Sequence, residues 1–167
     1  MPQRILIIDT SVLCCLLKIP GKETAGSGKD KCDFERINKL LVEESSVTRV
    51  LPLATIIETG NHISNSPSHR HRTSTELGEI IAAAANAASP WAAFADQADL
   101  WTPKQLLTLS EEWPSLAIGG TSIGDATIKQ VAEFYAKAGY EVEILTGDSG
   151  LKAYQPIVQP SPPRRRS

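Results

Sequence analysis

Residues 4–9 read RILIID, a short and mostly apolar run that ends at Asp9. Such a run is typical of a strand that is buried on both faces of a parallel sheet. Residues 141–148 read EVEILTGD and alternate in polarity before they also end at an acid, Asp148. The two stretches predict strands whose carboxyl ends each carry an acidic side chain.

Helices and further strands are predicted around these two stretches. Apolar residues recur at helical spacing over residues 33–44, and residues 47–53 read as a strand. A later helical pattern begins near Asp125 and stops at Gly139. Residues 157–158 are expected to form a last edge strand. This alternation is typical of an α/β fold, in which helices cover the faces of a parallel sheet.

The composition is that of an ordinary globular protein. The 167 residues fit one compact domain, which we expect over residues 1–158, followed by a flexible basic tail at 159–167. The 17 Lys and Arg residues nearly balance 19 Asp and Glu residues, so no overall positive charge marks a nucleic-acid binder. No apolar run approaches the roughly twenty residues of a membrane span, and no cleavage site follows the first apolar stretch. We therefore expect a cytoplasmic protein with no membrane contact.

Four acidic residues are expected to meet at one edge of the sheet. Asp9 and Asp148 directly follow strands, whereas Asp125 lies at a helix start and Glu58 on the helix after the second strand. Open parallel sheets bind ligands beyond the carboxyl ends of their strands. Carboxylates that are held close together repel, and either protonation of one of them or a bound cation relieves the repulsion. An oxygen-rich site of this kind favours Mg²⁺ or Mn²⁺.

Four segments carry these acids in a recognisable order. They are IDTSVLCCLL at 8–17, ATIIETGNHI at 54–63, SIGDATI at 122–128 and LTGDSGLKAY at 145–154. Their content and order resemble the four acidic motifs of the PIN domain family, and the likeness spans nearly the whole chain. Four ordered acids are more specific than any one of the motifs by itself.

The resemblance implies a three-layer α/β/α fold with a central parallel sheet of about four or five strands. It also implies an endoribonuclease that hydrolyses RNA phosphodiester bonds with Mg²⁺ or Mn²⁺, as a toxin or defence effector. Expected partners are RNA, an antitoxin or other inhibitory protein, and a second copy of the chain. The implied catalytic and metal-binding residues are Asp9, Glu58, Asp125 and Asp148, with Ser11 and Thr146 supporting them by hydrogen bonds.

A polar segment at residues 20–31 is longer than compact toxin members of that family need. It is rich in Gly, Lys, Ser and Thr, and it carries too little apolar surface to order itself, so we expect a mobile loop. Its lysines, Lys22, Lys29 and Lys31, could still contact a phosphate backbone.

A second polar segment, residues 64–74, contains SHRHR and is predicted to be a basic loop. Arg70 and Arg72 are candidate RNA-binding residues, because a guanidinium group can bind phosphate in a bidentate way. A solvated charged loop without RNA contact is the alternative.

Each acid also has a simpler interpretation. Asp9 and Asp125 could serve simply as helix caps, and Asp148 simply as a turn residue. An isolated Glu58 would by default lie on a solvated helix face. For the whole chain, one alternative is a non-catalytic RNA- or protein-binding module with the same fold. Another is a phosphate-handling hydrolase with Asp9 as covalent nucleophile, although Ser11 stands where a D-x-D motif needs its second Asp.

Overall fold

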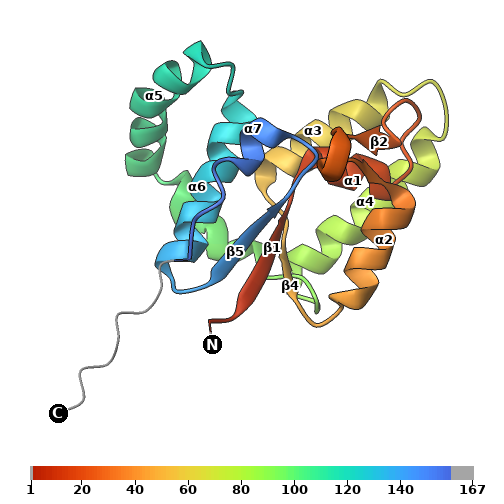
Figure 1. Ribbon diagram of the computed structural model, residues 1–167, viewed down its shortest axis with the longest axis horizontal. Helices are drawn as coiled ribbons and strands as arrows, with labels where there is room; N and C mark the ends of the chain where they lie inside the picture. Colours follow the sequence, from red (N-terminus) through yellow and green to blue (C-terminus); the bar gives the residue numbers. More distant parts are fainter. Residues whose placement is uncertain (1, 159–167) are drawn as a thin grey trace.

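The computed structural model describes residues 2–158, whose arrangement is drawn in Figure 1. The strands are β1 (Arg4–Ile8), β2 (Thr24–Ala25), β3 (Cys32–Asp33), β4 (Thr48–Val50) and β5 (Glu141–Leu145). The α-helices are α1 (Thr10–Leu16), α2 (Phe34–Glu43), α3 (Leu53–Ser64), α4 (Arg70–Ala85), α5 (Pro103–Ile118), α6 (Ile123–Lys137) and α7 (Ser149–Lys152). Two short 3-10 helices are η1 (Gly28–Asp30) and η2 (Phe94–Trp101).

The central sheet has three parallel strands in the order β4, β1, β5. The predicted α/β fold with a parallel sheet is thereby confirmed, but the predicted number of four or five strands is wrong. β2 and β3 form a separate antiparallel pair. Residues 157–158, expected as an edge strand, form no strand.

Both edges of this sheet are covered. Side chains that follow β5 cover one edge, and the segment around Pro90 covers the other, at β4. At β5, the Ile144 N–H donates to Gln155 Oε1 at 2.9 Å, and Lys152 Nζ donates to the Ile144 carbonyl at 2.8 Å. At β4, the Arg49 N–H donates to the Pro90 carbonyl, and the Arg49 carbonyl accepts from the backbone N–H of Ala92, each at 2.8 Å. Because these backbone groups already have partners, further strands cannot pair there.

The two faces of β1 belong to two different cores. Leu6 and Ile8 lie in a core with residues of α1, α2 and α4. Ile5 and Ile7 lie in a second core with residues of α6 and η2. Because side chains alternate across a strand, helices cover both faces of the sheet (Figure 1). The carboxyl ends of β1, β4 and β5 then lead into α1, α3 and α7.

The segment expected to be a mobile loop, residues 20–31, instead contains β2 and η1 and leads into β3. Gly26 has φ +76°, and a Cβ on it would lie 2.7 Å from the Gly147 carbonyl oxygen, so only glycine permits this approach. A Cβ on Gly147 would in turn lie 2.9 Å from Ala25 Cβ. The segment therefore packs against the turn that follows β5, a contact that its polar composition does not reveal.

The predicted basic loop at 64–74 holds for residues 65–69, which separate α3 from α4, and is wrong for the rest, because α4 begins at Arg70 and contains Arg72 in its first turn. The buried Thr73 donates its hydroxyl to the His69 carbonyl at 2.9 Å. Leu77, one turn later, is buried on the same helix face. Tertiary burial of this face stabilises a helix that the polar composition of its first turn does not predict.

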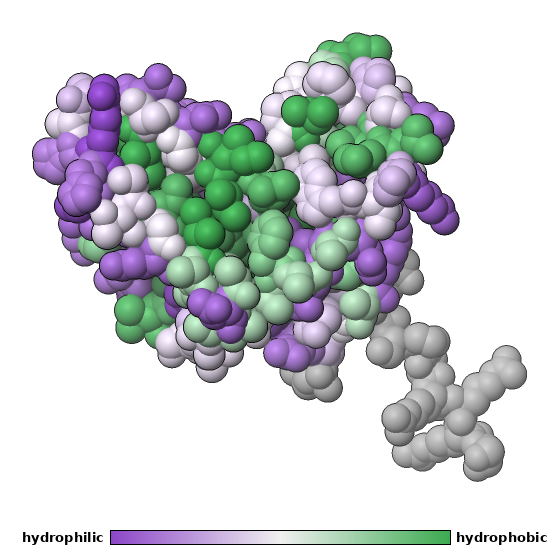
Figure 2. All heavy atoms as spheres, turned by 180° about the vertical axis from the view of Figure 1, so that it is seen from behind, coloured by the Kyte–Doolittle hydropathy of each residue, from purple (hydrophilic) through white to green (hydrophobic). Residues whose placement is uncertain are grey.

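Several large apolar side chains remain exposed, among them Ile57 on α3 and Leu106, Leu107 and Ile118 on α5. Figure 2 shows apolar residues around a hollow on the face opposite to that of Figure 1. Exposed apolar surface is typical of protein contacts, and an inhibitory protein or a second copy of the chain stays a predicted partner. No helix within residues 2–158 has the length and apolar character of a membrane span. The predicted basic tail, 159–167, lies outside the described residues.

Candidate functional site: a cavity lined by four acids

Acidic side chains from four separate parts of the chain line one cavity of about 350 Å³. Asp9 follows β1, and Glu58 lies on α3. Asp125 lies in the first turn of α6, and Asp148 precedes α7. The other lining residues are Thr10, Ser11, Cys14, Lys22, Thr24, Ala25, His62 and Ser122. The structure thus brings the four sequence-predicted acids together at the carboxyl end of the sheet.

Asp9 is the most buried of these acids, with 5% of its surface exposed. Its backbone N–H donates to the Leu145 carbonyl at 3.1 Å, which extends the pairing of β1 with β5 by one residue. Its Oδ2 accepts hydrogen bonds from Ser11 Oγ at 2.8 Å and from Thr146 Oγ1 at 2.7 Å. Two hydroxyl donors on one buried oxygen hold the carboxylate in a single orientation.

Ser11 and Thr146 also connect the turn after β5 to Asp9. Ser11 Oγ accepts from the Gly147 N–H at 3.0 Å, and Thr146 Oγ1 accepts from the Asp148 N–H at 2.9 Å. Each hydroxyl therefore donates to a carboxylate and accepts from the backbone, which uses both of its hydrogen-bonding roles. These hydrogen bonds tie the backbone at Gly147 and Asp148 to the residues that hold Asp9, so Asp148 lines the same cavity as Asp9.

Three contacts position Glu58. One turn earlier on α3, the buried Thr55 donates its hydroxyl to the Ile8 carbonyl at 2.8 Å, which anchors the helix to the end of β1. Thr10 Oγ1 donates to Glu58 Oε2 at 3.0 Å. On the other side, a Cβ on Gly124 would lie only 2.1 Å from Glu58 Oε1. Glu58 therefore packs against the start of α6, and the solvated-face interpretation does not describe it.

Replacement of Gly124 by Ala is expected to disturb the site without weakening the fold. The new methyl would meet the Glu58 carboxylate, which is the end of a flexible side chain and must turn away. Alanine is favoured over glycine in a helix by roughly 1 kcal/mol, so the melting temperature should hold or rise. We expect weaker Mn²⁺ binding by calorimetry.

The matched control is Gly78→Ala on α4, because a Cβ there would meet nothing within 4 Å. This variant should show the same helical gain in melting temperature and the wild-type affinity for Mn²⁺. Equal Mn²⁺ affinity in Gly124→Ala and Gly78→Ala would contradict a role for Glu58 at the cavity.

Asp125 is a partly buried acid in the first turn of α6. Its N–H donates to Ser122 Oγ, the cap of α6, at 3.0 Å. Burial, and after it the negative charges of the other three acids, together raise the pKa of the Asp125 carboxyl from 3.8 to about 6. The hydrogen bond with Ser122 lowers this pKa and offsets only part of the rise. A cation in the cavity would relieve the repulsion.

Asp148 is exposed and caps α7, since its Oδ1 accepts from the Gly150 N–H at 2.8 Å and from the Leu151 N–H at 3.3 Å. Asp9 caps α1 in a similar way, by accepting from the Ser11 N–H at 3.4 Å. Capping and a place on the cavity are therefore compatible, because each carboxylate has two oxygens and stands where a strand gives way to a helix.

The donor set of the cavity suits hard cations, because its acidic ligands are carboxylate oxygens. As the side chains stand, no three His, Cys, Asp or Glu residues within residues 2–158 form a group that could hold a metal ion. Mg²⁺ usually keeps several waters and takes only one or two protein carboxylates. An ion of this kind in the cavity would need few direct protein ligands, with water at its other positions.

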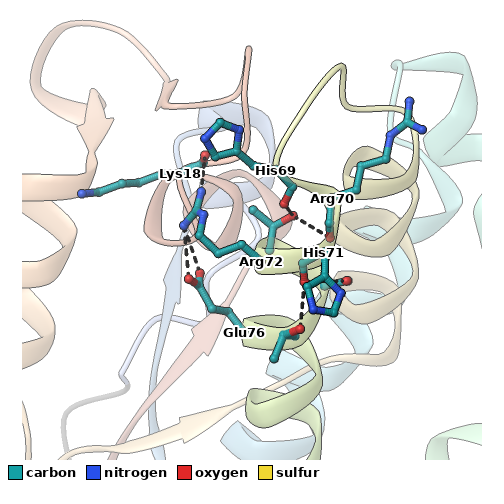
Figure 3. Close-up of polar contacts among 9 residues, drawn as sticks. Lys18, His69, Arg70, His71, Arg72 and Glu76 are labelled. Carbon is teal, nitrogen blue, oxygen red and sulfur yellow. Dashed lines mark hydrogen bonds and ion pairs between the residues drawn. The ribbon is translucent and has the colours of Figure 1, made fainter.

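Arg70 and Arg72 do not line the acid cavity. Figure 3 shows their side chains extending from α4 in different directions. Arg72 donates to Glu76 at 3.1 Å and to the Lys18 carbonyl at 3.5 Å. Arg70 Nε donates to the Ser66 carbonyl at 2.6 Å. RNA binding by these two residues stays a prediction, and the two side chains do not converge with the four acids.

Lys22 and His62 also line the acid cavity. Lys22 is expected from the sequence only as one of three lysines that could contact a phosphate backbone, and His62 is not among the predicted site residues. His62 follows Glu58 by four residues on α3, a spacing that puts both side chains on one helix face. The helical pattern around Glu58 thus contained a signal for His62. Nothing in the sequence distinguishes Lys22 from Lys29 and Lys31 of the same polar segment.

Comparison with known protein families, with curated protein sequences and with solved structures finds no match for this chain.

Proposed function

We propose that this protein is a metal-dependent endoribonuclease of the PIN type, which hydrolyses RNA phosphodiester bonds at the cavity of the four acids. The observation that carries the proposal is the presence of four carboxylates from distant segments in one cavity. Burial and their mutual repulsion raise the pKa of Asp125 to about 6. Carboxylates gathered against such repulsion are typical of cation-binding and catalytic sites.

The four acids would hold one or two Mg²⁺ or Mn²⁺ ions, directly or through water. When bound, such ions lower the pKa of a water molecule and neutralise charge on the phosphate oxygens. Asp9 contributes an oriented carboxylate, because the hydroxyls of Ser11 and Thr146 fix its Oδ2 and leave Oδ1 outside that network. Glu58 is similar, because Thr10 donates to Oε2 and leaves Oε1 outside that bond.

RNA as the substrate, and restraint by an antitoxin-like protein, are proposed from the resemblance of the four motifs to the PIN family. The acids follow β1, lie on α3, begin α6 and follow β5, in the order in which that resemblance expects them. Their meeting in one cavity supports the resemblance, because a chance match of short motifs carries no reason for such convergence.

Cleavage should require a divalent cation. We expect purified protein to cut total RNA at internal positions in Mn²⁺ or Mg²⁺ and to lose this activity in excess EDTA. In EDTA the carboxylates repel the phosphate of the substrate as well as one another. Gel electrophoresis with mapping of the new RNA ends measures the effect, and restoration by added Mn²⁺ is the control. RNA cleavage that persists in excess EDTA would refute the proposal, and so would the absence of cleavage in both Mn²⁺ and Mg²⁺.

A non-catalytic RNA- or protein-binding module is the second candidate. It is favoured by the capping hydrogen bonds that Asp9 and Asp148 already make, which give both carboxylates a structural role. Such a module would bind RNA with the same affinity in Mn²⁺ and in EDTA, and it would produce no new RNA ends. The cleavage assay therefore separates the two candidates.

A further inference from the structure

A single lysine, Lys22, lines the cavity of the four acids. Its backbone position is set by a tight turn over residues 19–22, in which the Lys22 N–H donates to the Ile19 carbonyl at 2.9 Å. Pro20 and Gly21 are the central residues, and Gly21 has φ +81°, a combination typical of a type II turn. Ile19 is fully buried. The turn therefore starts from the core, and Lys22 is held at a defined place.

The segment after Lys22 is a wall of the same cavity. Thr24 and Ala25 line it, and the close packing between Gly26 and Gly147 presses this segment onto the turn that leads to Asp148. Neither glycine leaves room for a side chain. The wall that carries Lys22 is thus built into the site, and it is not a loop that happens to pass nearby.

The charge of Lys22 is not used within the described part of the chain. No carboxylate of residues 2–158 forms an ion pair with it, whereas Lys129, Lys39 and Lys152 each pair with a glutamate. Cys14 lines the same cavity; its thiol pKa is raised to about 12, mainly by burial, and the charge of Lys22 lowers it. Two divalent cations would offset the four carboxylates, and the ammonium group would then remain to attract an anion.

We propose that Lys22 is a phosphate-binding residue of this site, which contacts a backbone phosphate of the nucleic acid whose scissile bond lies at the four acids. The proposal rests on the proposed function, because it needs a nucleic-acid phosphate in the cavity. Lysine suits this role as a mobile point charge that binds phosphate without a fixed orientation. Lys22 acts on binding, and the acids act on the chemistry.

Lys22→Gln should therefore weaken RNA binding more than turnover. We expect KM for a short single-stranded RNA in Mn²⁺ to rise about fivefold to tenfold while kcat stays within about twofold. The slope of log affinity against log salt should fall by about 0.7, the value for one lost phosphate contact on a single strand. Lys22→Arg, which keeps the charge, should restore most of the affinity.

The matched control is Lys29→Gln, which removes a lysine from the same segment but not from the lining of the cavity. Both side chains are exposed, so the melting temperatures of both variants should equal that of the wild type. Equal effects of the two variants on KM and on the salt slope would overturn the proposal. The proposal would also be overturned if Lys22→Gln changed only the Mn²⁺ concentration that activity requires and left KM and the salt slope unchanged.

Binding is measured separately by fluorescence anisotropy of the same RNA in Ca²⁺, so that the result does not depend on cleavage. If the wild type fails to cut RNA in Mn²⁺, the proposed nuclease function fails. A selective loss of binding in Lys22→Gln would still support the phosphate contact in that case. If the wild type cuts RNA and Lys22→Gln binds it as tightly as Lys29→Gln does, only the role of Lys22 fails.

Discussion

Asp9→Asn should reduce RNA cleavage by on the order of a thousandfold or more while the protein stays folded. Asparagine has nearly the same shape as aspartate, and its side-chain oxygen can still accept from the hydroxyls of Ser11 and Thr146. The negative charge is lost, however, and an NH₂ group replaces Oδ1, the oxygen that does not accept from these hydroxyls. The variant therefore keeps the fold and loses an ionic ligand at the most buried position of the cavity.

Cleavage of a labelled RNA in Mn²⁺ measures this effect, and circular dichroism reports folding. Glu79→Gln is the matched control, because Glu79 is an exposed acid on α4 that does not line the cavity. It removes the same charge and should keep wild-type activity. Wild-type cleavage by Asp9→Asn would rule out the four-acid cavity as the place of the reaction.

Asp125→Asn should stabilise the metal-free protein at neutral pH. The folded pKa of Asp125, about 6, exceeds its ordinary value of 3.8, so the folded state binds this proton more tightly than the unfolded state does. The corresponding stability is fully present below about pH 4 and is lost as pH rises through about 6. Asparagine carries no charge at any of these pH values, so it avoids the loss.

The gain is expected to be modest, because Asp125 is only partly buried. With allowance for solvent screening it corresponds to about 1 kcal/mol, or roughly 2–4 °C in melting temperature at pH 7.5. Near pH 4 the variant and the wild type should melt together. A variant that melts below the wild type at pH 7.5 in EDTA would contradict the repulsion among the acids.

The same variant should also lose its response to Mn²⁺. Binding to the folded state alone stabilises a protein by about 2.7 kcal/mol at a hundredfold excess over Kd. For the wild type at pH 7.5 this corresponds to a rise on the order of 5 °C. Asp125→Asn should show little of this rise, since one of its ionic ligands is gone. An equal rise in both proteins would place the bound Mn²⁺ elsewhere.

The sequence by itself determined the central strands and the acids that follow them. The apolar run before Asp9 and the alternating stretch before Asp148 each end where the structure ends β1 and β5. These features are local, because the side-chain period of a strand and the stop at an acid are read from neighbouring residues. The parallel order of the strands then placed their carboxyl ends together, which is why convergence of Asp9 and Asp148 could be expected.

Only the tertiary structure decided the number of strands and the conformation of the two polar segments. The edge of β5 is satisfied by Gln155 and Lys152, and no pattern of apolar residues announces such side-chain contacts. The segment at 20–31 is ordered against Gly147, far away in sequence. Arg70 joined a helix because later residues of α4 are buried.

The membership of the cavity was decided at the same level. Lys22 and His62 face the four acids because a turn and a helix are fixed by distant contacts, through the buried Ile19 and through the hydrogen bond from Thr55 to the end of β1. Periodicity specifies which face of an element is buried, but not which other element it meets. That choice depends on packing between residues that are remote in sequence, and so it emerges only when the chain is folded.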